Sequence, residues 1–372
     1  MVFELRFVMR NIFQNPFKMF FPKKMIGVDI GTSSLKIVEI SQLGQGIALE
    51  NYGEMASDSF YKNSTSDGAQ GSYLLSNSFI AKVIRGILDE SRIKNRSAIF
   101  SIPDFSTFCT SFDIPPMTSK EIPDAIRYNA SQYITLPISE VTLDWHISPN
   151  TPGEKNSSQR VFLIAVPNQV VQQYQTIAKL AGLNLHALEA EALGIMRALK
   201  NTRSLKTNKK IVCMVDIGIQ SSTINIVDKD FLKKSYSFNF NSGQLSRVIS
   251  SSLQIDKKAA EAIKDKEGLM YYRNDVVKAL YLLLDPLLIE IRSVCAEFFQ
   301  TEQKQVEEIY LTGGTANLPG LKEYFSESLK KTVLVPNSFS GFLYPPILEE
   351  SLRSMSPRFC AAVGVALGGL ET

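Results

Sequence analysis

Val28-Asp29-Ile30-Gly31 and Val215-Asp216-Ile217-Gly218 are the two stretches of this 372-residue sequence that decide its fold. In each, an apolar strand pattern ends in Asp-Ile-Gly, small hydroxyl residues follow in a tight turn, and a second strand pattern leaves. One such turn is weak evidence, since hairpins use these residues for geometry alone. Its recurrence with matching flanks predicts two equivalent halves.

The residue types of both turns suit a phosphate and a hydrated Mg²⁺ ion. Glycine lets the backbone turn sharply, successive N–H groups and hydroxyls cradle phosphate oxygens, and an Asp at the strand tip holds a hydrated metal. Two such hairpins facing across a cleft would clamp a triphosphate from both sides. The metal candidates are Asp29 and Asp216, and the phosphate candidates are Gly31, Thr32, Ser33, Ser34, Gly218, Ser221, Ser222 and Thr223.

Lys36 follows the first turn and has two interpretations. It adds a point charge to the phosphate site, or it is a solvated strand residue.

A third segment, Ile309–Leu321, runs from a buried strand pattern through Gly-Gly toward a helix. Backbone without side chains at a helix N-terminus would let a flat adenosine pack closely. The candidates for this contact are Gly313, Gly314, Thr315 and Asn317.

These three segments, in this order, resemble the phosphate-one, phosphate-two and adenosine motifs of the superfamily that contains actin, DnaK-type chaperones and sugar kinases. The resemblance implies a two-lobed α/β fold of the actin-like, ribonuclease H-like ATPase type, with ATP and Mg²⁺ as ligands. Residues 260–264 resemble the Glu-x-x-Lys helix of these proteins, which implies that Glu261 and Lys264 meet the ribose and the adenine edge. Residues 188–194 and 361–370 resemble the two connecting helices at the interdomain hinge.

Within the superfamily the chain resembles the PilM family of type IV pilus assembly, relatives of the division protein FtsA. The resemblance runs from about Met19 to the C-terminus, and Asn129 and Ser242 depart from the family pattern. Ile219 and Gln220 replace glycines that many members of the superfamily have in the second phosphate turn, although PilM proteins often lack them too. It implies the inserted subdomain called 1C. The segments that carry it are 112–118, 125–128, 132–134, 143–145 and 161–182.

The predicted organisation follows from this resemblance and from a basic polar linker near residues 200–210. Residues 1–24 form an N-terminal extension or membrane-facing segment. Subdomain 1A comprises 25–96, 183–208 and 358–372; 1C comprises 97–182; 2A comprises 209–230 and 303–357; 2B comprises 231–302.

The N-terminal extension has two interpretations. It carries aromatic and basic residues typical of a segment lying on an anionic membrane. Alternatively, translation starts at Met19 and only a short lead precedes the first strand.

Composition restricts the remaining function classes. The net charge of +3 gives no electrostatic reason to expect nucleic acid. The four cysteines, Cys109, Cys213, Cys295 and Cys360, lie far apart and are expected to be free thiols rather than a zinc site. A Walker loop, a His-Glu-x-x-His motif and a Gly-x-Ser-x-Gly elbow are all missing from the sequence.

The resemblance therefore implies a cytoplasmic ATP-binding protein at the inner face of the cytoplasmic membrane, with weak or absent hydrolysis. It would dock the N-terminal tail of a PilN-like inner-membrane protein in a groove between 1A and 1C. Pilus assembly ATPases and further copies of the chain are additional candidate partners. The alternatives are an FtsA-like division protein and, on Glu189 or Glu191 as a catalytic carboxylate, a small-molecule kinase.

Local patterns predict several helix boundaries. Thr118 or Ser119 is expected to cap a helix reaching Tyr133, and Asn168 to cap one that ends near Gly182. Helical patterns cover 243–264 and 274–301, and Pro286 is expected to kink or split the second.

Overall fold

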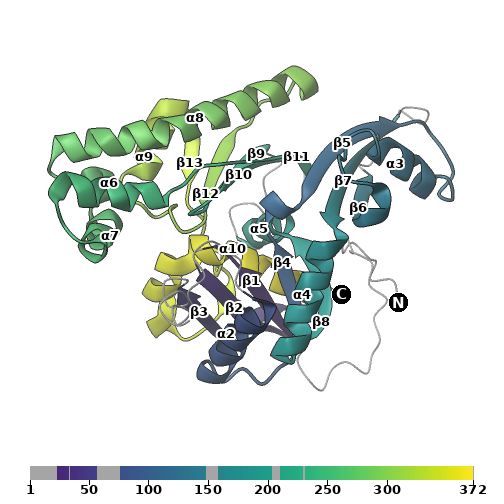
Figure 1. Ribbon diagram of the computed structural model, residues 1–372, viewed down its shortest axis with the longest axis horizontal. Coiled ribbons are helices and arrows are strands. Elements are labelled where there is room, and N and C mark those ends of the chain that lie inside the picture. Colours follow the sequence, from purple (N-terminus) through teal and green to yellow (C-terminus); the bar gives the residue numbers. More distant parts are fainter. Residues whose placement is uncertain are drawn as a thin grey trace. The chain divides into compact units, whose positions relative to one another are not determined.

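The computed structural model describes residues 23–32, 34–56, 76–147, 158–202, 210–228 and 231–371. The chain forms two compact units (Figure 1). Unit 1 comprises Met1–Ala198, Gly341–Pro345 and Ala361–Thr372; unit 2 comprises Leu199–Ser340 and Pro346–Cys360. The N-terminal residues 1–22, Ser33 and most of the expected loop at 61–78 lie outside the described residues.

Unit 1 is built on a mixed six-stranded sheet with the strand order β14-β3-β2-β1-β4-β8. β1 to β3 form an antiparallel meander, whereas β4 runs parallel to β1 and β8 runs parallel to β4. Its strands are β1 (Lys24–Ile30), β2 (Ser34–Leu43), β3 (Gly46–Ala56), β4 (Ser97–Ile102), β8 (Asn184–Ala190) and β14 (Phe342–Leu343).

Four helices accompany this sheet: α2 (Asn77–Glu90), α4 (Asn168–Ala181), α5 (Glu191–Asn201) and the end of α10 (Glu349–Glu371). The hydroxyl of Ser76 caps α2 by accepting the Phe79 N–H at 3.3 Å. Gly182 ends α4 with a left-handed φ of 73°, as the sequence predicts. α2 and α4 pack against each other beside the sheet (Figure 1).

α10 approaches its neighbours so closely that glycine is required at the contacts. A Cβ added to Gly27 in β1 would lie 1.9 Å from the carbonyl oxygen of Ala362. A Cβ added to Gly364 would lie 1.7 Å from the carbonyl oxygen of Gly194 in α5. Glycine therefore lets two helices cross backbone to backbone in unit 1.

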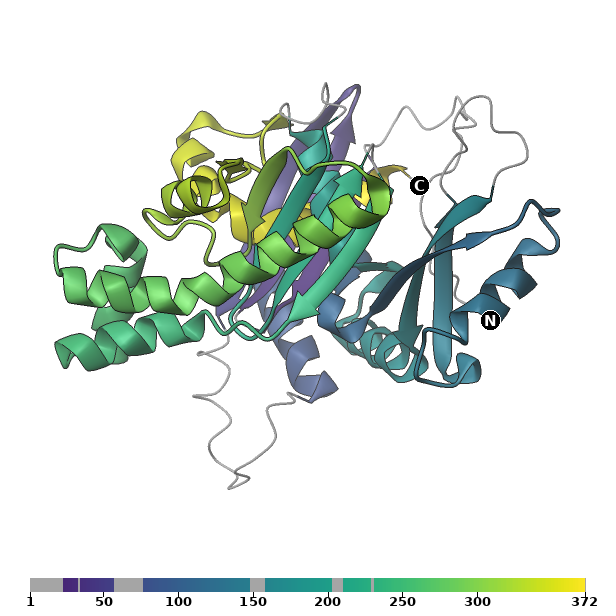
Figure 2. The same cartoon turned by 90° about the horizontal axis from the view of Figure 1, so that it is seen from above.

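A separate three-stranded antiparallel sheet in unit 1 has the order β5-β7-β6 (Figure 2). Its strands are β5 (Phe108–Ile114), β6 (Val141–Ile147) and β7 (Gln159–Pro167), with the short helices η2 (Asp104–Ser106) and η3 (Ile138–Glu140) at its margins. α3 (Ile122–Ala130) packs on it around a core of its own. β4 and α4, which fall in the range 97–182 expected for 1C, associate instead with elements of the six-stranded sheet. The four subdomain boundaries stay a prediction.

Unit 2 contains a five-stranded sheet with the order β11-β10-β9-β12-β13 and one apolar core that includes residues of the long helix α8 (Figure 2). The strands are β9 (Val212–Ile217), β10 (Ser222–Asp228), β11 (Phe231–Phe238), β12 (Glu308–Thr312) and β13 (Thr332–Leu334). The helices are α6 (Gly243–Leu253), α7 (Lys257–Lys266), η4 (Gly268–Met270), α8 (Asn274–Glu302), α9 (Leu321–Leu329) and η5 (Pro346–Leu348).

Two predicted helix caps are wrong. α3 begins at Ile122 after Glu121, and Thr118 instead donates its N–H and its hydroxyl to the Glu121 carboxylate, each at 2.8 Å. Asn168 is the first residue of α4, and its side chain is engaged by the Thr142 hydroxyl at 2.8 Å. In both places a nearby polar partner uses the group that was expected to cap.

Two helix assignments also differ from expectation, at 243–264 and at 188–190. Of the two outcomes expected at Pro286, a split is wrong, because α8 is one helix over all of Asn274–Glu302, and a kink stays a prediction. The pattern at 243–264 forms two helices, because Gln254 adopts a left-handed φ of 55° between them. Residues 188–190 belong to strand β8, and the connecting helix α5 starts at Glu191. Within the described ranges, no helix is both long and apolar enough to cross a bilayer.

Candidate functional site

The first Asp-Ile-Gly hairpin is the β1–β2 turn of unit 1. β1 pairs with β2 so that Asp29 stands opposite Lys36 and Ile30 opposite Leu35. The Gly31 N–H donates to the Ser34 carbonyl at 3.1 Å, which closes the turn. The register explains why a sequence spacing of seven residues brings the acidic and the basic side chain together.

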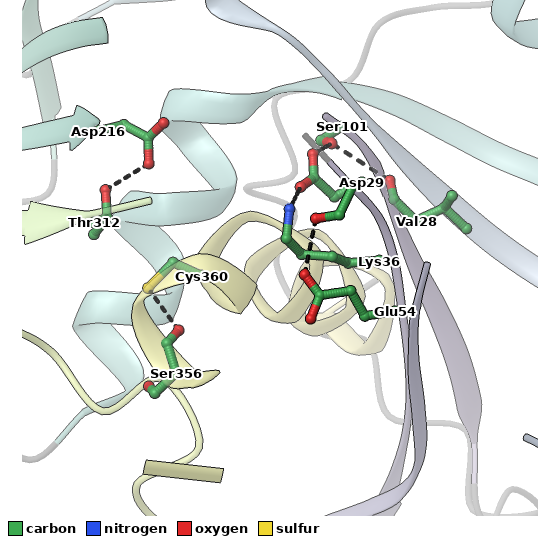
Figure 3. Close-up of polar contacts among 10 residues, drawn as sticks. Val28, Asp29, Lys36, Glu54, Ser101, Asp216, Thr312, Ser356 and Cys360 are labelled. Carbon is green, nitrogen blue, oxygen red and sulfur yellow. Dashed lines mark hydrogen bonds and ion pairs between the residues drawn. The ribbon is translucent and has the colours of Figure 1, made fainter. Parts of the chain in front are cut away.

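The carboxylate of Asp29 lies in a buried polar cluster (Figure 3). The Ser101 hydroxyl, from neighbouring strand β4, donates to Oδ1 at 2.7 Å. The Lys36 Nζ lies 3.2 Å from Oδ2, and the two side chains expose only 7% and 6% of their surface. Lys36 is therefore not a solvated strand residue; that it adds a point charge to a phosphate site stays a prediction.

Lys36 is held in its charged form by its neighbours. Burial alone lowers the pKa of Lys36, but the carboxylates of Asp29 and Glu54, and more weakly that of Glu191, outweigh burial, so that its pKa is raised above the ordinary value. Glu54 is itself oriented by the Ser34 hydroxyl, which donates to its Oε1 at 2.8 Å. The first hairpin thus presents a positive charge among three carboxylates.

The second hairpin, β9–β10 in unit 2, repeats the backbone of the first. The Gly218 N–H donates to the Ser221 carbonyl at 3.1 Å, and a Cβ on Gly218 would lie 2.6 Å from that oxygen. The Ser242 hydroxyl donates to the Gly218 carbonyl at 2.8 Å. The same bond closes both turns, so the repeated motif corresponds to repeated structure.

The side chains of the second hairpin differ in what they contact. Asp216 Oδ1 accepts a hydrogen bond from the Thr312 hydroxyl at 2.9 Å (Figure 3). The Thr223 hydroxyl lies 3.0 Å from that of Ser237 in β11 and is therefore already engaged. The Ser222 hydroxyl is buried and has no hydrogen-bond partner among the described residues, which leaves it able to bind a further polar group.

The Gly-Gly segment begins where β12 ends beside β9. Thr312 pairs with Asp216 in the parallel register, and Gly313 follows with φ of 86°. A Cβ on Gly313 would lie 2.6 Å from the Ile217 carbonyl, so this glycine permits packing on β9. A Cβ on Gly314 would meet nothing within 4 Å, so Gly314 is the one that borders open space.

The other adenosine candidates have different surroundings. Thr315 is 9% exposed, and the Asn317 side chain donates to the Ser354 carbonyl in α10. Asn317 therefore anchors the segment within unit 2.

The Glu-x-x-Lys residues lie on α7, which Asp256 caps by accepting the Ala259 N–H at 2.8 Å. Glu261 pairs with Lys257 at 3.6 Å, and Lys264 pairs with Asp265 at 3.3 Å. After α7, the Leu269 N–H donates to the Pro319 carbonyl at 2.9 Å. The structure thus ties the end of this helix to the Gly-Gly segment inside unit 2.

The oxygen donors suit Mg²⁺, which retains waters and needs few protein ligands. Among the residues that the structure describes, no group of three or more His, Cys, Asp or Glu side chains could hold a metal. Asp29 and Asp216 would therefore act singly, through bound water. The two hairpins belong to different units, so the binding of one triphosphate by both of them stays a prediction.

Several contacts of the site were missed in the sequence. Thr312 directly precedes Gly313 at the end of a strand pattern, and this position could have indicated from the sequence that Thr312 belongs to the site. Ser101 carried no signal, since its role depends on the pairing of β4 with β1. Glu189, the carboxylate offered for a kinase, forms two hydrogen bonds with Arg197 at 2.6 and 2.7 Å and is buried. It is therefore a structural ion pair.

Comparison with solved structures defines the class of protein. A PilM–PilN type IV pilus biogenesis complex superposes with a TM-score of 0.78 at 24% identity, covering 94% of this chain and 99% of the other. The ethanolamine utilization protein EutJ from Carboxydothermus hydrogenoformans gives 0.51 at 18% identity over 94% and 90%. MreB5 of Spiroplasma citri, solved with AMPPNP, gives 0.50 at 12% identity over 93% and 95%. The fold is that of the actin-like ATPases, as the sequence predicts.

A family model assigns the chain to a narrower class than the fold does. The family model described as type IV pilus assembly protein PilM matches residues 27–370. The chain belongs to this PilM family, which confirms the resemblance drawn from the sequence and favours it over the division-protein and kinase alternatives.

Proposed function

We propose that this chain is a cytoplasmic, ATP-binding component of type IV pilus assembly that docks the N-terminal tail of a PilN-like inner-membrane protein. The observation that carries the nucleotide part is the Asp29 cluster at the tip of β1, with its backbone turn repeated at Asp216. Membership of the PilM family supports the proposed role in type IV pilus assembly. The protein would lie at the inner face of the membrane through its partner.

Three features of the described residues support ATP as the ligand. Both turns present backbone N–H groups and hydroxyls of the kind that bind phosphate. The buried Ser222 hydroxyl has no partner within the described chain and directly follows the second turn. Open space beside Gly314, on a segment tied to the end of α7, is compatible with an adenosine near Glu261 and Lys264. Mg²⁺ would be held through waters on the two aspartates and would neutralise phosphate charge.

We expect weak or absent hydrolysis. Ile219 and Gln220 stand in the second turn where many members of the superfamily have glycine, so the backbone there is less free to follow a phosphate. The role is then that of a nucleotide-dependent binding platform, in which ATP favours one conformation of the protein.

For the PilN-like tail we propose the junction between the six-stranded and the three-stranded sheets of unit 1. The solved structure with a TM-score of 0.78 is a PilM–PilN complex. At this junction Phe105, between β4 and β5, is 54% exposed, and Phe108, the first residue of β5, is 38% exposed. Exposed aromatic side chains close together in the chain suit the apolar residues of a short peptide.

The proposal is tested by isothermal calorimetry with a peptide from the N-terminal tail of a PilN-like protein. We expect binding that changes with ATP, and loss of binding in Phe105→Ser. Tyr272→Ser, at a more exposed aromatic in unit 2 (77% exposed), is the control and should bind normally. Absence of peptide binding with ATP, with ADP and without nucleotide would refute the docking role.

A further inference from the structure

The metal candidate Asp29 already has a cationic partner in unit 1. We propose that Lys36 competes with Mg²⁺ for the Asp29 carboxylate, and so sets how strongly nucleotide binding depends on the metal. This inference rests on the proposed ATP binding. It concerns the metal requirement of that site, which the fold alone does not determine.

Both oxygens of the Asp29 carboxylate already accept a hydrogen bond. Lys36 Nζ lies 3.2 Å from Oδ2, and the Ser101 hydroxyl donates to Oδ1 at 2.7 Å (Figure 3). A hydrated divalent cation that uses this carboxylate must share it with the Lys36 ammonium or displace that ammonium, since both side chains are buried. The ammonium is buried and charged, so it also repels an approaching cation with little screening by solvent.

Other carboxylates also interact with the positive charge of Lys36, apart from Asp29. Glu54 and Glu191 also act on its charge, and all three carboxylates belong to unit 1. A phosphate oxygen held at the Gly31 turn would be a further partner for the same ammonium. These carboxylates stabilise the charge of the lysine whether or not the metal takes Asp29.

Two binding regimes follow from this arrangement. Without Mg²⁺, Lys36 neutralises Asp29 and the carboxylate does not repel a triphosphate. With Mg²⁺, the cation replaces Lys36 at Asp29. The wild-type protein should consequently bind ATP with only a shallow dependence on Mg²⁺.

The test compares ATP binding by calorimetry in EDTA and across a MgCl₂ titration for the wild type, Lys36→Met and Lys36→Arg. Lys36→Met removes the charge. We expect the Mg²⁺ concentration that gives half of the metal-dependent gain in ATP affinity to fall about tenfold in this variant. Its affinity for ATP in EDTA should also drop about tenfold, and both changes lie within the usual range for two coupled ligands. Lys36→Arg keeps the charge and should stay near the wild type. Lys36→Gln keeps a donor toward Asp29 without the charge, so it replaces Lys36→Met if that variant does not fold.

A second measurement needs no nucleotide. MgCl₂ alone should raise the thermal midpoint of Lys36→Met or Lys36→Gln more than that of the wild type, because their Asp29 carboxylate has lost its competitor. Asp29→Asn combined with Lys36→Met has no carboxylate at this position and should give no such increase.

The outcomes separate this inference from the proposed function. Equal Mg²⁺ midpoints in the wild type and the uncharged variants would overturn the competition while leaving ATP binding intact. If the wild type ignored ATP at every Mg²⁺ concentration, the proposed function would fail. The thermal response to MgCl₂ would then still decide whether Lys36 and Mg²⁺ compete.

Discussion

Gly364→Ala should destabilise the protein, although alanine is the better helix former. The added Cβ would lie 1.7 Å from the Gly194 carbonyl oxygen and 2.3 Å from its carbon. These are backbone atoms, so α5 and α10 must move apart to admit a methyl group. Overpacking of this kind costs about 1–3 kcal/mol, and the rigid neighbour puts this site at the upper end. The gain in helix propensity, about 1 kcal/mol, leaves a net loss of about 2 kcal/mol.

Gly86→Ala is the matched control, since it makes the same change inside helix α2. A Cβ at Gly86 would meet nothing within 4 Å, so only the propensity gain remains. We expect the control to be stabilised by about 0.5–1 kcal/mol. Urea unfolding followed by circular dichroism measures both variants against the wild type. A Gly364→Ala protein as stable as Gly86→Ala would show that the close helix crossing is wrong.

Three further predictions concern Arg197, Asp29 and Gly313. Arg197→Met leaves Glu189 without its partner in a buried pair and should cost about 3–5 kcal/mol in urea unfolding, whereas exposed Arg85→Met should change stability by less than about 0.5 kcal/mol. Asp29→Ala should weaken Mg²⁺-ATP binding in calorimetry, and an unchanged affinity would remove Asp29 from the site. Gly313→Ala should lower the thermal midpoint, because φ of 86° and 2.6 Å to the Ile217 carbonyl both disfavour a Cβ; Gly314→Ala, with open space, should not.

The fold class was predictable because its signals are local. Asp-Ile-Gly followed by small hydroxyl residues specifies a tight turn between two strands, and both turns close by the same N–H to carbonyl bond. The end of α4 at Gly182 was predictable for the same reason, since a left-handed residue ends a helix within one turn. Where a polar side chain had a choice of partners, as at Asn168, the prediction failed.

Edge strands were harder to predict than the central ones. β14 has two residues and β13 has three, and each is a strand only because a longer parallel neighbour pairs with it. The end of strand β8, residues 188–190, was assigned to a helix, since Leu, Glu and Ala favour helices by local propensity. In these places the neighbouring chain, and not the local composition, determines the conformation.

The sequence by itself determined the two hairpins and the Gly-Gly segment, because these depend on residues a few positions apart. The structure added the buried Asp29–Lys36 pair across the first turn. Only the tertiary structure decided that Ser101, 72 residues away, completes the Asp29 cluster, and that Thr312 reaches Asp216 from 96 residues away. Both partners arrive on parallel neighbouring strands. Parallel pairing needs a long crossover, so no local spacing in the sequence records it.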